Sequence, residues 1–237
     1  MTLFFSIWDT FVKNFIGTDG KNFQLMMEGL KNTLLISVFA CLIGIVIGSA
    51  FGIVRVSHDR SEHPKWWLKI LNGIAKVYIT VIRGTPVALQ LLIIYMGIFK
   101  FLGPAILIGS LAFGINSGAY VAENIRAGIM AVDKGQNEAG LSLGLDKTTI
   151  MKKIIAPQAL KNILPALGNE FIAVIKETAI LGTVSIIDLT FASQQIVAIT
   201  RDYMFNLCLV GLIYLIIVIV LTYLLKLLER RLAKNDR

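Results

Sequence analysis

Polar and charged side chains occur inside or beside long apolar stretches of this sequence, at spacings that place them on common helix faces. Asn116, Tyr120 and Glu123 follow one another at i, i+4 and i+7, which puts them on one face of a helix. A charge at the centre of a bilayer costs about 2.5–3.5 kcal/mol on insertion scales, so such residues normally face a bundle interior or a cavity. Donors and acceptors on one face suit a zwitterion. This face is a candidate lining for the path of a polar substrate.

A second candidate face lies further along the chain. Asn162, Asn169 and Lys176 repeat every seven residues, again on one helix face, with two glutamates beside it. The candidate substrate-path residues are Gln90, Asn116, Tyr120, Glu123, Asn169, Glu170, Lys176 and Glu177. Interhelical hydrogen bonds and salt bridges, including a Glu123–Arg126 pair at i, i+3, are the alternative interpretation. Spacing alone leaves both interpretations open.

Catalytic and metal-binding patterns are absent from the sequence. There is no GxxxxGK[ST] phosphate-binding loop and no HExxH motif. The two histidines, His58 and His63, flank one charged loop, and Cys41 and Cys208 fall inside apolar runs. We therefore expect no enzymatic activity, no metal site and no cofactor in this chain, and no nucleic acid as a partner.

Residues 133–157, DKGQNEAGLSLGLDKTTIMKKIIAP, interrupt the apolar sequence with charges and glycines. Asp133, with Gln136 three residues later, resembles a capping box that opens a helix through about Leu143. Gly144 is well placed as the left-handed residue that ends this helix. The first half of the segment is therefore predicted to form a short helix.

A second short helix is predicted directly after the first. Asp146 can cap a helix over Lys147–Ile155, and Pro157 then closes or kinks it. Gly140 and Gly144 are four residues apart, a spacing that lets another surface approach the backbone closely. Three leucines and one acidic residue share the segment: Leu141, Leu143, Leu145 and Glu138. This density of apolar side chains in a loop predicts a docking surface for a partner.

Composition and hydropathy indicate the elements that hold these residues. The chain is 56% hydrophobic and only 16% charged, whereas soluble domains carry about 25% charged residues. Asn32–Val54, Phe101–Ala122 and Tyr203–Leu225 are uncharged and reach the roughly 20 residues that a bilayer needs. Two weaker spans are expected at about 85–99 and at Leu160–Ala179. The prediction is an all-α polytopic membrane protein with five transmembrane helices.

Basic residues indicate the orientation of these spans. Arg55–Arg83 and Arg126–Lys161 hold six Lys and Arg each, and Lys226–Arg237 holds five. With five spans these groups fall on one side of the membrane, which the positive-inside rule makes cytoplasmic. The N-terminus is then outside and the C-terminus in the cytoplasm. The net charge of +8 therefore need not indicate nucleic acid.

The remaining segments complete a single domain over residues 1–237. Residues 1–28 form an expected external amphipathic segment, and PKWWLKILNGIAKVY (64–78) an expected helix on the cytoplasmic surface. Thr85 and Pro86 are expected to cap and open the second span, which places Arg83 on the cytoplasmic side as an anchor or loop clamp. Leu181–Ile199 is expected to form an external helical hairpin that packs back on the bundle.

The loop at 133–157 is similar to the signature of ABC-importer permeases, E-A-A, three residues, G, nine residues, I-x-L-P. Glu138-Ala139-Gly140, Gly144 and Ile154–Pro157 stand at these positions. Gly140 replaces the third alanine, and Ala156 replaces the leucine. Other stretches resemble the polar amino-acid branch of that family: RGTP (Arg83, Gly84, Thr85, Pro86), AYVAENIRAGI (119–129) and ALKNILPALGNEFIAVIKET (159–178).

The resemblance implies a type I ABC-importer permease in the bacterial cytoplasmic membrane. It implies a dimer of ATPase subunits that binds ATP and Mg²⁺, a second permease, identical or closely related, and an extracytoplasmic amino-acid-binding protein. The residues expected to couple this chain to the ATPase are Gln136, Glu138, Ala139, Gly140, Leu141, Gly144, Leu145, Asp146 and Pro157. An ion-coupled secondary amino-acid carrier is the alternative, which five spans without a visible repeat disfavour.

Overall fold

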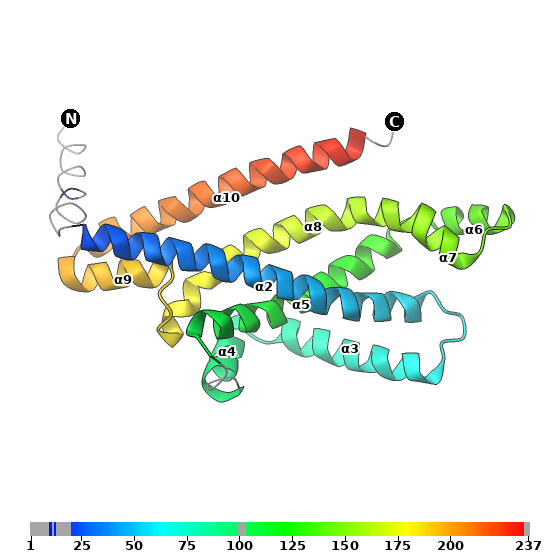
Figure 1. Cartoon of the computed structure of the whole chain (residues 1–237), viewed down its shortest axis with the longest axis horizontal. Coiled ribbons are helices and arrows are strands. Elements are labelled where there is room, and N and C mark those ends of the chain that lie inside the picture. Colours follow the sequence, from blue (N-terminus) through cyan, green and yellow to red (C-terminus); the bar gives the residue numbers. More distant parts are fainter. Residues whose placement is uncertain (1–9, 11, 13–19, 99–102, 235–237) are drawn as a thin grey trace.

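The computed structural model describes residues 10, 12, 20–98 and 103–234, and every regular element in this part is helical. This confirms the all-α prediction for the described residues. Long helices run side by side, with α6 and α7 at one end of the bundle and α9 at the other (Figure 1). The elements are α2 (Lys21–Asp59), α3 (Trp66–Gly84), α4 (Val87–Leu92), η2 (Ile93–Ile98), α5 (Ala105–Met130), α6 (Lys134–Ser142), α7 (Lys147–Ile150), η3 (Met151–Ile155), α8 (Ala156–Glu177), η4 (Thr178–Val184), α9 (Leu189–Thr200) and α10 (Tyr203–Lys234).

The most extensive helix packing is between α2 and α5. Gly44, Gly48 and Gly52 recur every four residues on α2, and all three face α5. A Cβ atom at Gly48 would lie only 2.5 Å from the Cβ of Val121. Small residues at this spacing let two helix backbones approach closely within a membrane. The glycine seam of Gly44, Gly48 and Gly52 therefore joins α2 to α5.

The helix α3 corrects the expected surface helix at 64–78. It runs antiparallel to α2 (Figure 1) and packs on both α2 and α5. The hydroxyl of Tyr78 donates to the Ile115 carbonyl at 2.6 Å, and its ring stacks on Phe51 with centroids 4.6 Å apart. These contacts make the segment part of the bundle. Its start contains tryptophans and lysines, and the helix then continues into apolar sequence.

The chain turns sharply after α3, at the RGTP stretch. Helices Trp66–Gly84 and Val87–Gly97 meet at an angle of 108°. Pro86 has no N–H and disfavours helical geometry at the preceding residue, and Thr85 is accordingly extended, with φ −121° and ψ 148°. The expectation that Thr85 caps the next helix is wrong: Pro86 occupies the N-cap position, and Thr85 Oγ1 donates back to the Val81 carbonyl.

The helical path from α7 into α8 does not stop at Pro157. It passes through the π-helical segment η3, where the Ala156 N–H donates to the Met151 carbonyl, five residues back. Proline removes one N–H and its ring clashes with the carbonyl four residues earlier, and the wider π turn accommodates both effects. Of the two outcomes predicted at Pro157, closure is wrong, because the helical path continues to Glu177.

The segment expected as an external hairpin consists of η4 and α9. It packs on α2 and α10 at the end of the bundle opposite α6 (Figure 1). Asn32 donates to the Ile187 carbonyl at 2.8 Å, and the Leu189 N–H donates to Thr33 Oγ1 at 3.1 Å. Asp188, fully buried, caps α9 by accepting from two backbone N–H groups. These contacts fix the hairpin to the start of α2.

Three described helices are long and apolar enough to cross a membrane: α2, α5 and Tyr203–Leu232 of α10. The bent pair α3–α4 makes a fourth span if both halves count as one. The number of five spans and their orientation stay predictions. Residues 21–28, expected in the external amphipathic segment, form the start of α2. Most of the preceding segment and the expected helix end at Phe99 lie outside the described residues.

Candidate functional site

The loop after α5 forms the two short helices that the sequence predicts. Asp133 caps α6 by accepting from the Gly135 N–H at 2.6 Å. Gly144 has φ +77°, and its N–H donates to the Leu141 carbonyl while the Leu145 N–H donates to the Gly140 carbonyl. This pair of bonds is a Schellman motif, which satisfies the last carbonyls of a helix.

Asp146 starts α7 in the same way. Its carboxylate accepts from the Thr148 and Thr149 N–H groups at 3.0 and 3.1 Å and from the Thr149 hydroxyl. These hydrogen bonds, the one from the Thr149 hydroxyl above all, lower the pKa of Asp146 below its usual value. The carboxylate therefore stays ionised and its cap is intact near neutral pH.

Exposed apolar side chains mark the outer surface of this loop. Leu143 is 79% exposed and Leu141 44% exposed. Gly144 has nothing within 4 Å of a Cβ placed on it, so its surroundings are open. The close approach at Gly140 is internal, because a Cβ there would lie 2.7 Å from Ile150 of α7. Of the two glycines, Gly144 alone is free to meet a partner.

The other coupling residues divide between the surface and the fold. Glu138, Ala139 and Pro157 are exposed, and Leu145 packs against the apolar cluster beneath α7. The Gln136 amide oxygen accepts from Gln158 Nε2 at 3.3 Å, which connects α6 to α8. The predicted coupling residues that are exposed are Gln136, Glu138, Ala139, Leu141, Gly144, Asp146 and Pro157, and the neighbouring Leu143 is exposed with them.

A buried hydrogen-bond network holds the turn after α3. Gln90 Nε2 donates to the Ile82 carbonyl at 2.7 Å and to the carbonyl and Oγ1 of Thr85 at 3.0 and 2.7 Å. Asn116 Nδ2 donates to Gln90 Oε1 at 2.8 Å. Gln90 and Asn116, both expected along the substrate path, are buried. In this chain they join α5 to the α3–α4 turn, and Asn116 has little surface left for a ligand.

A cluster of polar side chains gathers around the middle of α5. The Arg83 guanidinium lies over the Tyr120 ring, 5.2 Å from its centroid. Glu170 of α8 lies beside Ser117 and within electrostatic range of Arg83. The buried Ser117 hydroxyl makes no hydrogen bond of regular geometry with any described residue. We refer to Arg83, Ser117, Tyr120 and Glu170 as the α5 polar cluster.

Two findings about this cluster go beyond the sequence interpretation. Arg83 stands at the end of α3 over Tyr120 of α5, and its expected place on the cytoplasmic side stays a prediction. Ser117 was missed, although it follows Asn116 directly and lies three residues before Tyr120, a spacing that also shares a helix face.

The other predicted path residues lie elsewhere. Glu123 accepts from Arg126 Nη1 at 2.9 Å, which is the alternative salt bridge considered above. Asn169 and Lys176 are exposed on α8, and Glu177 lies half-buried near Glu170 and Lys176. Asn162, on the same α8 face, is exposed and donates to the Gly128 carbonyl at 3.4 Å.

Residues 44–234 match the family described as "Binding-protein-dependent transport system inner membrane component", and this chain belongs to that family.

Its relatives and structural neighbours agree. The arginine transport system permease protein ArtQ of Bacillus subtilis is 41% identical, covering 89% of this chain and 94% of that protein. The glutamine transport system permease protein GlnP of Escherichia coli is 38% identical, covering 87% and 92%. The crystal structure of an amino acid ABC transporter with histidines matches with a TM-score of 0.81 at 42% identity, covering 92% of this chain and 98% of that one. The MetNI methionine ABC transporter, at 17% identity and a TM-score of 0.76, covers 89% and 97% and shares the fold.

The chain is therefore an amino-acid ABC-importer permease and a multi-pass protein of the bacterial plasma membrane. This confirms the family resemblance and favours the importer permease over the ion-coupled carrier. Membership implies an ATPase and a binding protein as partners.

Proposed function

We propose that the α5 polar cluster forms part of the path along which this permease passes a polar amino acid. The observation that carries the proposal is that Arg83 of α3, over the Tyr120 ring, and Glu170 of α8, beside Ser117, lie within electrostatic range of each other along α5. Glu170 is half-buried and Arg83 is exposed in the single chain, and charged side chains on membrane helices normally face a bundle interior or a water-filled pathway. α3, which ends at the RGTP turn, carries Arg83 to this place.

The chemistry of the cluster suits a zwitterion. Arg83 can hold a carboxylate through two parallel hydrogen bonds, and Glu170 can accept from an ammonium group. Ser117 and Tyr120 add hydroxyl groups between them. Relatives of similar identity are named for arginine and for glutamine, so the proposed substrate class is a polar amino acid with an uncharged or cationic side chain.

A second permease, identical or closely related, completes the path in this proposal. The face of α8 bearing Asn162, Asn169 and Lys176 is exposed in the single chain. Exposed amide and ammonium groups on a membrane helix need a partner or a water-filled cavity. A second permease chain against this face would enclose the path between the two.

The loop of α6 and α7 is the proposed docking surface for the ATPase subunits, which bind ATP and Mg²⁺. Leu141 and Leu143 present apolar side chains there, and the open Gly144 allows close approach. In this chain neither a cofactor nor a metal is needed for the proposed role.

Uptake by the complete transporter in proteoliposomes tests the substrate path. Arg83→Met and Glu170→Gln should each raise the half-saturation for arginine or glutamine uptake by about 30-fold or more, because removing one partner of a desolvated charge contact costs 2–5 kcal/mol. Binding-protein concentration is kept saturating, and Glu229→Gln, on the exposed end of α10, is the matched control. Unchanged half-saturation together with poor assembly would reassign the cluster to helix packing.

A further inference from the structure

We propose that Asp59 and Arg60, at the turn between α2 and α3, are positioning residues that transmit movement of the docking helix α6 to α3 and the α5 polar cluster. The inference rests on the proposed role of the α6–α7 loop in docking the ATPase. Its structural basis is a set of contacts that attach the α2–α3 loop to the last turn of α5, four residues before α6 begins.

The first attachment is a cap on α5. Arg60 Nη2 donates to the Ile129 carbonyl at 3.0 Å, across 69 residues of sequence. Ile129 is one of the last residues of α5, whose final carbonyls have no partner within the helix. A guanidinium at this end also meets the negative end of the helix dipole. Burial lowers the pKa of Arg60 from its usual value, although an arginine remains charged at all physiological pH values.

The second attachment is an ion pair between Asp59, the residue before Arg60, and Arg126 of α5. Arg126 Nε donates to Asp59 Oδ2 at 2.7 Å, and Arg126 Nη1 donates to Glu123 Oε1 at 2.9 Å. Arg126 therefore connects the loop carboxylate of Asp59 to its own helix. His58 Nδ1 lies 3.3 Å from the other Asp59 oxygen and restricts that carboxylate further. We refer to the contacts of Asp59 and Arg60 with α5 as the loop latch.

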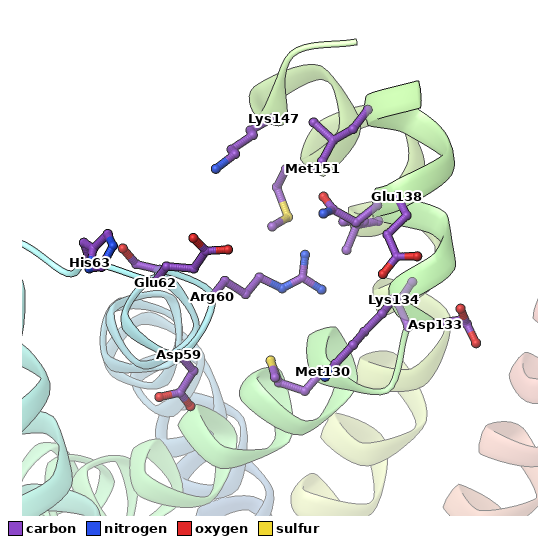
Figure 2. A pocket seen from close by; sticks show the side chains of 15 residues that line it. Asp59, Arg60, Glu62, His63, Met130, Asp133, Lys134, Glu138, Lys147 and Met151 are labelled. Atoms are coloured by element: carbon purple, nitrogen blue, oxygen red, sulfur yellow. The ribbon is translucent and has the colours of Figure 1, made fainter. Parts of the chain in front are cut away.

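Beyond the latch, a cleft separates the α2–α3 loop from the docking helices. It has a volume of about 720 Å³ and lies between Glu62 and His63 on one side and Glu138, Lys147 and Met151 on the other. Figure 2 shows Arg60 reaching from the loop into the space between these two walls. Within the described structure, α6 packs mainly on α7 and η3. The connection from the loop to α6 therefore runs through the latch and the end of α5.

The α2–α3 loop leads directly into α3, so a movement at the latch would reach α3. α3 starts at Trp66, six residues after Arg60, and is an uninterrupted helix to Gly84. Arg83 at its far end meets Tyr120. A displacement of the end of α5 by the docked ATPase would move the start of α3 through the latch. It would thereby shift Arg83 relative to Glu170 on α8, which is attached to α6 through α7 and η3.

Measurement of coupling in the assembled transporter tests the latch. The variants are Asp59→Asn, Arg60→Gln and Arg126→Gln, and the control is Glu62→Gln, an exposed carboxylate on the same loop and cleft wall. The readouts are the amount of folded complex, basal ATPase activity, and amino acid imported per ATP hydrolysed. We expect basal ATPase activity to persist while import per ATP falls about five-fold or more in the latch variants, the lower end of typical coupling between sites. Glu62→Gln should behave as the unmodified protein.

A double variant separates a shared contact from two independent effects. Asp59→Asn combined with Arg126→Gln should be no worse than the more severe single variant, because both remove the same ion pair. Latch variants that lower only the yield of folded complex, with normal import per ATP, would overturn the inference. Gly144→Leu in the α6–α7 loop distinguishes failure of the latch inference from failure of the proposed docking role. If it abolishes stimulation by loaded binding protein while latch variants couple normally, the latch inference fails alone. If it too leaves coupling normal, the proposed docking role has failed.

Discussion

Substitution of the glycine seam between α2 and α5 provides a graded test of the fold. Gly48→Ala would place a Cβ atom 2.5 Å from both Cβ and Cγ1 of Val121 and 2.8 Å from the Gly118 carbonyl oxygen. Carbon atoms in ordinary contact are about 3.5–4.0 Å apart, so the added methyl group lacks about 1 Å of space. Rotation of Val121 cannot relieve the contact at its Cβ, which is fixed by the backbone. The two helices must separate, and overpacking of this kind costs about 1–3 kcal/mol.

Three other glycines calibrate the effect. At Gly44 the nearest atom is the movable Ser117 hydroxyl at 2.9 Å, and at Gly52 it is the Ala122 carbonyl at 3.0 Å. Gly211 on α10 has nothing within 4 Å, so alanine there can only gain helix propensity, by up to about 1 kcal/mol. The expected order of destabilisation is Gly48→Ala, then Gly44→Ala and Gly52→Ala, with Gly211→Ala neutral or stabilising.

Unfolding of the purified permease in mixed micelles, titrated with a denaturing detergent, measures these differences. Gly48→Ala and Gly211→Ala should differ by about 1–3 kcal/mol in unfolding free energy, because the gain in helix propensity is common to both. A double-mutant cycle isolates the contact: Gly48→Ala should cost less in a Val121→Gly background than in the unmodified protein, limited by the remaining Gly118 contact. Equal stability of Gly48→Ala and Gly211→Ala would refute the close approach of α2 to α5.

Two further predictions concern the α3–α4 turn and the topology. Gln90→Leu should lower the unfolding free energy by about 1–3 kcal/mol for each buried partner left unsatisfied, because Asn116 and the Ile82 and Thr85 carbonyls all lose a hydrogen bond. The control is Gln194→Leu, at an exposed position. Equal unfolding free energies of the two variants would contradict the network. In a background without Cys41 and Cys208, a membrane-impermeant thiol reagent should label Tyr203→Cys on intact cells and Lys134→Cys only after permeabilisation; labelling of both from outside would refute the orientation.

Local chemistry made the two short helices of the α6–α7 loop predictable. The Asp133 and Asp146 caps and the left-handed Gly144 each depend on residues within five positions of one another. Such short-range preferences are visible in the sequence, since the same few residue types satisfy helix ends everywhere. The sequence left open whether the helix closes or kinks at Pro157, because a π turn depends on how the following helix packs.

The packing of segments that lie far apart in the sequence was harder to predict. The tryptophans and lysines of 64–78 are typical of a membrane interface, yet the same residues also stand at the end of a helix that enters the bundle. Choosing between these possibilities requires knowledge that α3 packs on α2 and α5. The Asp59–Arg126 pair is separated by 67 residues, so no spacing rule indicates it. The four-residue repeat of Gly44, Gly48 and Gly52 was present in the sequence as a recognisable packing signal.

Two exposed helices of this chain require different surroundings, and this contrast supports the proposed pairing with a second permease. The apolar window of α10 is only 6% buried, and its exposed side chains, such as Leu212, Leu215 and Ile219, are suited to lipid. On α8 the exposed side chains include Asn169 and Lys176, which lipid would leave without hydrogen-bond partners. α10 can therefore face the bilayer as it stands, whereas α8 needs a polar neighbour. Because α8 also contributes Glu170 to the α5 polar cluster, the surface that needs a neighbour adjoins the proposed substrate path. A path shared between two permeases satisfies both requirements with one interface.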